Sequence, residues 1–309
     1  MATNDRFDQF STEIVREDQI LRSIASASSG QRGVQVGPGD DAAVLFPVES
    51  PLVVSVDQCI EGLHFLPGTP LKDVGVKAVR RAAGDLAAMA AAPVALVATA
   101  LLPKSMTNQE AFLLYEAIQL EAQNLNCPLV GGDTSIQHRE SDFGLHLTVT
   151  VIGTATRPVL RSGAKVGDRV CVTGPLGGSL ASGRHLFPPV RIAEALQLST
   201  ELGDDLHAMI DISDGLGKDA MAVASSSNVR FMLEASLIPC HPGSGWEDAI
   251  KDGEDHELLF VIGECADCSN LPFHVSEIGK VIAGHPGVMV SNDEGHHIDV
   301  SKEGWNHGA

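Results

Sequence analysis

The class of fold is decided by two adjoining stretches, DVGVKAVRRAAGDLAAMAAAP (Asp73–Pro93) and VALVATALL (Val94–Leu102). The first predicts a helix that is capped at Asp73 and ended by Pro93. Its apolar side chains recur at helical spacing, at Val76, Val79, Ala83, Leu86 and Met89. The second is a continuous apolar run, which is typical of a buried strand. A helix that leads straight into a buried strand indicates a chain of mixed α/β class.

The same mixture of helices and strands extends in both directions from this stretch. Upstream, residues 7–27 predict an amphipathic helix, and downstream Thr107 and Glu110 form a capping box at the start of another helix. FGLHLTVTVIG (143–153) predicts a strand with one apolar face, formed by Leu145, Leu147, Val149 and Val151. In the second half, AMIDISDG (208–215) predicts a strand that ends in carboxylates, and LGKDAMAVASSS (216–227) predicts a helix.

A turn-rich joint, RPVLRSGAKVGD (157–168), separates the two halves of the chain. The 309 residues are enough for two domains with a sizeable core. We therefore expect an N-terminal domain over residues 1–155 and a C-terminal domain over residues 156–309.

The charge balance excludes some classes of partner. The formal net charge is −19, which is unsuited to holding a nucleic-acid backbone. A nucleotide could still bind if metal ions stood between its phosphates and the carboxylates of the chain. The six cysteines are scattered and indicate free, reduced thiols. The sequence has no apolar signal core at its start and no apolar run long enough to span a membrane, so we expect a cytoplasmic protein.

Aspartates recur where apolar segments meet turns, or stand among small residues. They are Asp40, Asp41, Asp57, Asp85, Asp133, Asp211 and Asp214. Spread over both halves, they suggest carboxylates that converge on one place, where Mg²⁺ would offset their mutual repulsion. The alternative is a set of independent turn and cap residues. Asp85 weighs against that alternative, because it stands among alanines inside a helical pattern; a local kink at Gly84 is the rival explanation.

Standard nucleotide-binding motifs are absent from the chain. It has no G-x-x-x-x-G-K-[ST] loop and no G-x-G-x-x-G opening a helix. Seven blocks instead carry a resemblance in order along the chain. They are GDDAAVL, VSVDQCIEGLHF, DVGVKAVRRAAGDLAAMAAAP, VGGDTS, RSGAKVGD, IDISDGL and DGEDHELLF. Together they resemble the thiamine-monophosphate kinases, which belong to the superfamily of aminoimidazole-ribonucleotide synthetase and selenophosphate synthetase. The resemblance extends from about Phe7 to Trp305.

The resemblance implies a fold and an activity. The implied fold is α/β (α+β), with an N-terminal mixed sheet that binds ATP and Mg²⁺ and forms a homodimer, and a C-terminal α/β sandwich. The implied reaction is transfer of the γ-phosphoryl group of ATP onto thiamine monophosphate, giving thiamine diphosphate. It is a direct in-line transfer aided by several Mg²⁺ ions, and it needs no catalytic side chain, because the acceptor phosphate is already a nucleophile.

The resemblance also implies site residues, position by position. The metal ligands are Asp41, Ser55, Val56 through its carbonyl, Asp57, Asp85, Asp133, Asp211 and Asp214. The ATP contacts are Gly132, Asp133, Arg161 and Ser213. The substrate contacts are His64, Glu254 and Trp305, whose ring would stack on the thiamine ring system. For Trp305 the alternative is an aromatic residue that merely docks the chain end on its own domain.

The chain departs from the family pattern in several places. Gly84 stands where the family usually has Ser, Asp252 where it has Gly, and His256 where Tyr or Phe is common. The stretches before Pro188 and before Glu254 are shorter than in the family. Two other functions stay open: a different ATP-using synthetase of the superfamily, and a non-catalytic nucleotide-binding relative.

Overall fold

The computed structural model describes residues 33–37, 42–137 and 143–305. The helix predicted over residues 7–27 and the aspartates Asp40 and Asp41 lie outside these ranges. The chain divides into two compact units. The first contains Val54–Ala82, Pro93–Gly153 and the described residues before position 50, and the second contains Ser50–Val53, Ala83–Ala92 and the chain from Thr154 onward. None of the described helices is long and apolar enough to cross a lipid bilayer.

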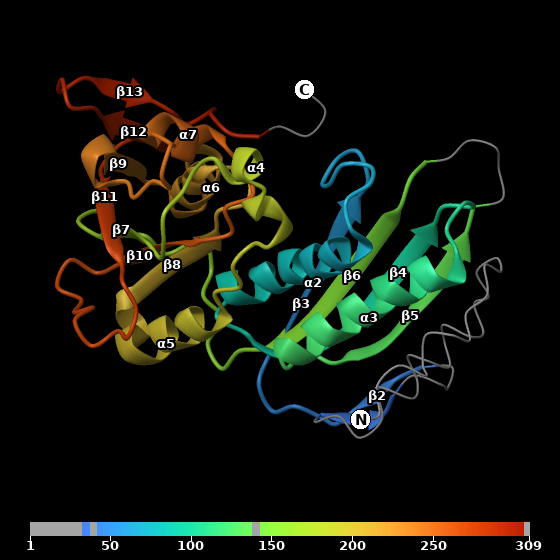
Figure 1. Cartoon of the computed structure of the whole chain (residues 1–309). Coiled ribbons are helices and arrows are strands. Elements are labelled where there is room, and N and C mark those ends of the chain that lie inside the picture. Colours follow the sequence, from blue (N-terminus) through green and yellow to red (C-terminus); the bar gives the residue numbers. More distant parts are fainter. Residues whose placement is uncertain (1–32, 38–41, 138–142, 306–309) are drawn as a thin grey trace. The chain divides into compact units, whose positions relative to one another are not determined.

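The first unit is built around a four-stranded sheet in the order β3-β6-β4-β5, in which β4 and β5 are parallel. Two long helices, α2 and α3, lie along one face of this sheet (Figure 1). A short antiparallel pair, β1 and β2, precedes it. The bounds are β1 Val34–Val36, β2 Val44–Leu45, β3 Leu52–Ile60, α2 Leu71–Ala88, β4 Ala92–Leu102, α3 Asn108–Asn124, β5 Leu129–Ile136 and β6 His146–Thr154.

Two of the predicted helix caps can be compared with the observed first residues of α2 and α3. Thr107 caps α3 in a complete capping box with Glu110, which confirms that prediction. The cap predicted at Asp73 is wrong, because α2 already begins at Leu71 and Asp73 lies inside its first turn. A carboxylate there still interacts favourably with the positive end of the helix. The helix runs without interruption through Gly84 and Asp85.

Alternation along the strands determines which side chains face the helices. Leu145, Leu147, Val149 and Val151 are all buried, as the apolar face of the predicted strand requires. On the edge strand β3, by contrast, Val54 and Val56 are 61% and 59% exposed. The strand therefore presents apolar side chains on the side of the sheet away from α2 and α3.

Two aspartates predicted at strand ends lie inside strands instead. Asp57 is a central residue of β3, and Asp133 follows Gly132 within β5. The prediction misplaced them because Gly and Asp are usually turn residues. Gly132 is needed in the strand itself: a Cβ at that position would overlap the backbone of Ala98 on the paired strand β4.

The second unit contains a seven-stranded sheet in the order β13-β12-β9-β11-β7-β10-β8. All described pairings are antiparallel except that of β9 with β12. The strands are β7 Arg169–Val172, β8 Leu206–Asp211, β9 Arg230–Glu234, β10 Leu258–Ile262, β11 Ser276–Ile282, β12 Gly287–Ser291 and β13 His297–Asp299. The helices are α4 Ser179–Ser182, α5 Ile192–Leu202, α6 Leu216–Ser227 and α7 Trp246–Lys251, with short 3₁₀ turns η1 Arg184–Leu186, η2 Gly203–Asp205 and η3 Ala235–Leu237.

Each face of this sheet has its own apolar core. On one face, Ile210 and Leu259 pack with residues of α6 and α7. On the other, Met209 and Phe260 pack with residues of α5. Neighbouring residues of one strand point to opposite faces, so both cores are supplied by the same strands. This arrangement fixes β8, whose last residue is Asp211, from both sides.

The close approach of β4 and β5 gives a test of the first unit. We expect Gly132→Ala to lower the free energy of unfolding by about 1–3 kcal/mol, because the added Cβ forces the strand pair apart. Urea unfolding followed by circular dichroism measures the change. Gly131→Ala is the matched control, since a Cβ there would meet only the Val97 side chain at 3.8 Å. Equal stability of the two variants would contradict the steric explanation.

Candidate active site

Two loops of the second unit are joined by backbone hydrogen bonds. One follows β8 and carries Ile212 and Ser213; the other, 252–257, precedes β10. The Glu254 N–H donates to the Ser213 carbonyl at 2.7 Å, and the His256 N–H donates to the Ile212 carbonyl at 2.7 Å. The Ile212 N–H in turn donates to the Glu257 carbonyl at 2.8 Å. Asp211, Ser213, Asp214 and Glu254, which the sequence predicts as site residues, are therefore held by one frame.

The second of these loops is strained. Glu254 and His256 adopt positive φ angles of 68° and 53°, a region that costs free energy for residues with a Cβ. The backbone bonds to the neighbouring loop hold them there. Strain of this kind persists where the surrounding structure imposes it, and it is common at binding and catalytic sites.

His256 lies between a predicted metal ligand and a predicted substrate contact. Its Nδ1 is 3.6 Å from Asp211 Oδ2, and its Nε2 is 3.6 Å from Glu254 Oε2. Complete burial would lower the pKa of His256, but the two carboxylates outweigh burial and raise it to about 9. The two carboxylates thus favour the protonated, cationic form of the buried His256 ring. The sequence showed it only as a departure from the family pattern.

Asp219, in the first turns of α6, fixes the loop that carries Asp214. Its Oδ2 accepts the N–H groups of Ser213 and Asp214, at 3.0 and 2.9 Å. Burial and the nearby Asp211 carboxylate raise the pKa of Asp219 to about 7, although the two N–H groups oppose that change. Sequence reasoning missed this residue. The available signal was an aspartate in the first turn after a glycine, where its side chain can reach back to orphan N–H groups.

The C-terminal segment reaches the same loop. The Trp305 N–H donates to the Asp214 carbonyl at 2.8 Å, and Lys218 Nζ donates to the Trp305 carbonyl at 2.7 Å. Gly304 makes this approach possible, because a Cβ there would lie 2.7 Å from the Asp214 carbonyl oxygen. Trp305 as a whole residue is 46% exposed. Its backbone is anchored by hydrogen bonds while a large part of the residue stays accessible to a ligand.

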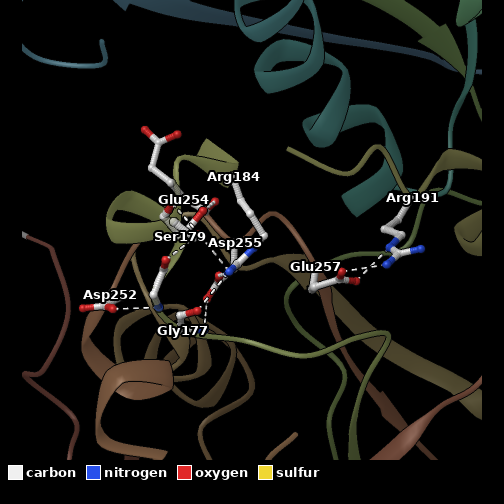
Figure 2. A network of polar contacts seen from close by, with 10 residues as sticks. Gly177, Ser179, Arg184, Arg191, Asp252, Glu254, Asp255 and Glu257 are labelled. Atoms are coloured by element: carbon white, nitrogen blue, oxygen red, sulfur yellow. Dashed lines mark hydrogen bonds and ion pairs between the residues drawn. The ribbon is translucent and has the colours of Figure 1, made fainter. Parts of the chain in front are cut away.

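A glycine-rich turn before α4 is tied to the segment 252–257 (Figure 2). The Gly177 N–H donates to Asp255 Oδ2 and the Gly178 N–H to Asp252 Oδ2, each at 2.8 Å. Ser179 Oγ donates to the Glu254 carbonyl at 2.7 Å. The Asp at position 252, where the family usually has Gly, is thus an acceptor for this turn.

A cavity of about 540 Å³ borders this network. It is lined by Ser179, Ser182, Gly183, Arg184, Phe187, Pro189, His241, Asp255 and Glu257. Arg184 donates to Asp255 Oδ1 at 3.3 Å. Burial, with a smaller effect of Arg184, lowers the pKa of His241. The volume is in the range of small-molecule sites, and Asp255, which lines the cavity, is the sequence neighbour of the predicted substrate contact Glu254.

Asp85 belongs to the part of α2 that lies in the second unit. Its neighbour Gly84 faces the His256–Asp211 pair: a Cβ on Gly84 would lie 3.7 Å from His256 Nδ1 and 3.8 Å from Asp211 Oδ2. Asp85 is half-buried. The structure thus brings the helical turn of Asp85 next to Asp211.

The remaining predicted residues of the first unit are spread over β3, β5 and a turn. Asp57 forms an ion pair with Arg81 of α2, with Arg81 Nε 3.1 Å from Asp57 Oδ2. Gly132 and Asp133 are exposed, as is Val56, and Ser55 is half-buried. His64 Nδ1 accepts the Ile60 N–H at 2.9 Å, so the neutral ring carries its proton on Nε2.

Arg161 is not brought together with the carboxylates of the second unit. Its carbonyl accepts Ser227 Oγ at the last residue of α6, whereas Asp214 precedes the first residue of that helix. Asp41 lies outside the described residues. Its role and that of Arg161 stay predictions.

The donor chemistry of these residues fits Mg²⁺. They offer hard carboxylate and hydroxyl oxygens, and burial together with the nearby Asp211 carboxylate raises the pKa of Asp219. Among residues 33–37, 42–137 and 143–305, however, no three His, Cys, Asp or Glu side chains are grouped closely enough to hold a metal ion. The predicted ligands are divided between the two units.

Known proteins with similar sequences and structures were found over most of the chain. Residues 39–155 match the family model "AIR synthase related protein, N-terminal domain". A thiamine-monophosphate kinase of Rhodopirellula baltica is 33% identical, over 89% of this chain and 92% of that protein. The crystal structure of thiamine-monophosphate kinase from Stenotrophomonas maltophilia has a TM-score of 0.78 at 25% identity, over 94% of this chain and all of that one. A structure described as AaThiL complexed with AMPPCP and TMP has a TM-score of 0.74 at 27% identity, over 94% of this chain and 95% of that one.

The buried carboxyl of Asp255 gives a pH-dependent test. Burial raises its pKa from 3.8 to about 6, although the Gly177 N–H and Arg184 oppose that change. Its contribution to stability is therefore full below about pH 4 and is lost as the pH rises through 6. Asp255→Asn cannot ionise. Relative to wild type, its free energy of unfolding should rise by roughly 3 kcal/mol between pH 4 and pH 7.5, measured by urea titration. Parallel pH curves for the two proteins would contradict this.

Proposed function

This chain belongs to the thiamine-monophosphate kinases, and from that membership we propose that it transfers the γ-phosphoryl group of ATP to thiamine monophosphate in a direct, in-line step that requires Mg²⁺. The product is thiamine diphosphate. The membership rests on 33% identity over 89% of the chain to one such kinase. The similar AaThiL structure is a complex with AMPPCP and TMP, which supports an ATP-like molecule and a thiamine phosphate as the ligands of this chain.

The arrangement around Trp305 is the observation that carries the proposal. Its backbone is bound to Asp214, and Glu254 is bound through its own N–H to Ser213, the neighbour of Asp214. Asp214, a predicted metal ligand, therefore lies between two predicted substrate contacts, Trp305 and Glu254. The indole of this exposed residue suits the cationic thiazolium of thiamine monophosphate, since Trp is the strongest aromatic partner for a cation. This geometry favours substrate binding over the alternative that Trp305 only docks the chain end.

The metal ions would be held by the oxygen donors predicted for them: Asp41, Ser55, the Val56 carbonyl, Asp57, Asp85, Asp133, Asp211 and Asp214. When bound, they would neutralise phosphate charge that the side chains of an acidic protein cannot. Ser213, Gly132 and Arg161 are proposed as ATP contacts.

The side chains of the chain bind and orient the reactants. His64, whose Nδ1 accepts the Ile60 N–H, is proposed as a substrate contact. Glu254 is held in a fixed backbone conformation by Ser213, and its carboxylate faces the cation of His256. Positioning of this kind is the main contribution a protein makes to phosphoryl transfer.

We also propose a homodimer formed through the first unit. Val54 and Val56 expose apolar side chains on the edge strand β3, and a second copy of the same face would cover them.

All six cysteines are free thiols in the structure, in keeping with the reducing cytoplasm as the proposed location.

A coupled assay for ADP release, with ATP, MgCl₂ and thiamine monophosphate, tests the function. Thiamine diphosphate should form, and unphosphorylated thiamine, the control, should not be converted. A chain that binds ATP and Mg²⁺ but does not release ADP with thiamine monophosphate would favour one of the two other functions left open by the sequence.

We predict that ATP binding depends on divalent metal. The carboxylates proposed as ligands repel the phosphates unless a cation is present. Calorimetric titration of ATP should therefore show binding with millimolar MgCl₂ and no measurable binding with excess EDTA. Equal affinity under both conditions would rule out the proposed role of the aspartates.

We predict that Trp305→Ala weakens substrate binding selectively. A desolvated contact between an indole and a cation is worth about 2 kcal/mol, so KM for thiamine monophosphate should rise roughly 30-fold. KM for ATP should change little, because the contact is with the other reactant. Steady-state kinetics with each substrate varied in turn measures both. A parallel rise of the two constants, or a loss of thermal stability alone, would make Trp305 a structural anchor.

A further inference from the structure

Lys218, in the first turn of α6, contacts two parts of the candidate site at once. Its Nζ is 2.5 Å from Asp214 Oδ2, and it also donates to the Trp305 carbonyl at 2.7 Å. The Trp305 N–H meanwhile donates to the Asp214 carbonyl at 2.8 Å. Lys218, Asp214 and Trp305 thus form a closed triangle of contacts. The family resemblance assigns no role to Lys218.

A lysine ammonium and a divalent cation cannot both lie against the same carboxylate oxygen without repelling each other. In the structure the ammonium of Lys218 occupies that place on Asp214. A cation bound to Asp214 would therefore weaken the contact with Lys218. The bond from Lys218 to the Trp305 carbonyl does not depend on that carboxylate oxygen and can stay.

We propose that Lys218 is a positioning residue that couples metal occupancy at Asp214 to the position of Trp305. Without metal, Lys218 neutralises Asp214 and holds the C-terminal segment against it. With metal, the ammonium moves away from Asp214 while it keeps its hydrogen bond to the Trp305 carbonyl. The carbonyl then moves with the ammonium, which shifts the indole ring. The inference rests on the proposed role of Asp214 as a metal ligand and of Trp305 as a substrate contact. In it, Lys218 controls where Trp305 lies relative to Asp214.

The emission of Trp305 reports this coupling without turnover. The chain has two tryptophans, so a Trp246→Phe background leaves Trp305 as the single one. MgCl₂ is titrated into this protein with a non-hydrolysable ATP analogue present. We expect a saturable change in emission in the background protein. In Lys218→Met, which keeps the aliphatic stem and removes the charge, we expect that change to be lost.

The metal concentration at half-saturation is a second measurement, and the direction in which it changes distinguishes the proposal from a purely structural role of Lys218. Binding of Mn²⁺, followed by electron paramagnetic resonance in the presence of the same analogue, should become tighter in Lys218→Met by about threefold, the effect of removing one exposed competing cation. A residue that only stabilised the loop would weaken metal binding when removed. Lys218→Arg should restore both the emission change and the wild-type metal affinity.

Lys251→Met is the matched control. Lys251 also pairs with the C-terminal segment, through Glu303 at 3.8 Å. It should behave like the background protein in both readouts. The inference is overturned if Lys251→Met and Lys218→Met give the same result, if Lys218→Met binds Mn²⁺ less tightly, or if the background protein shows no metal-dependent emission. Absence of thiamine monophosphate turnover with these readouts intact would overturn the proposed function and leave the coupling standing.

Discussion

The site of the second unit depends on the backbone hydrogen bonds that join Ile212 and Ser213 to the segment from Glu254 to Glu257. These bonds hold Glu254 and His256 in left-handed conformations that neither residue would keep in isolation. They also hold the loop that follows Asp211, the last residue of β8, and that carries Ser213 and Asp214 before the first turn of α6. Because the cores on both faces of the sheet immobilise β8, the strain is carried by packed structure on each side.

Positive side chains accompany the predicted acidic ligands. Arg81 pairs with Asp57, His256 lies between Asp211 and Glu254, and Lys218 pairs with Asp214. A chain with a net charge of −19 needs such partners wherever its carboxylates are gathered. Of the three, only His256 is buried. Lys218 and Arg81 keep some access to solvent.

Much of the local structure could be predicted because it depends on residues close in sequence. The capping box of Thr107 and Glu110, the helix over Leu216–Ser227 and the strand that ends at Asp211 all follow the predictions. The errors occurred where pairing overrides local preference. Asp57 and Asp133 were placed at strand ends because Asp and Gly favour turns, yet neighbouring strands supply hydrogen bonds that extend β3 and β5 past them.

The sequence by itself determined the family, the α/β class and the candidate carboxylates. Each of these depends on short blocks of neighbouring residues, which can be recognised without knowing the contacts between distant parts of the chain. Only the tertiary structure decided which residues support them. Lys218 and Trp305 are 87 positions apart, and Ser179 and Glu254 are 75 apart. Nothing in the spacing of such residues predicts a contact, since the contact exists only after packed helices and strands have brought distant loops to the same edge of a sheet. His256 is the plainest case: the sequence shows it only as a departure from the family pattern, and the fold places its buried ring between the carboxylates of Asp211 and Glu254.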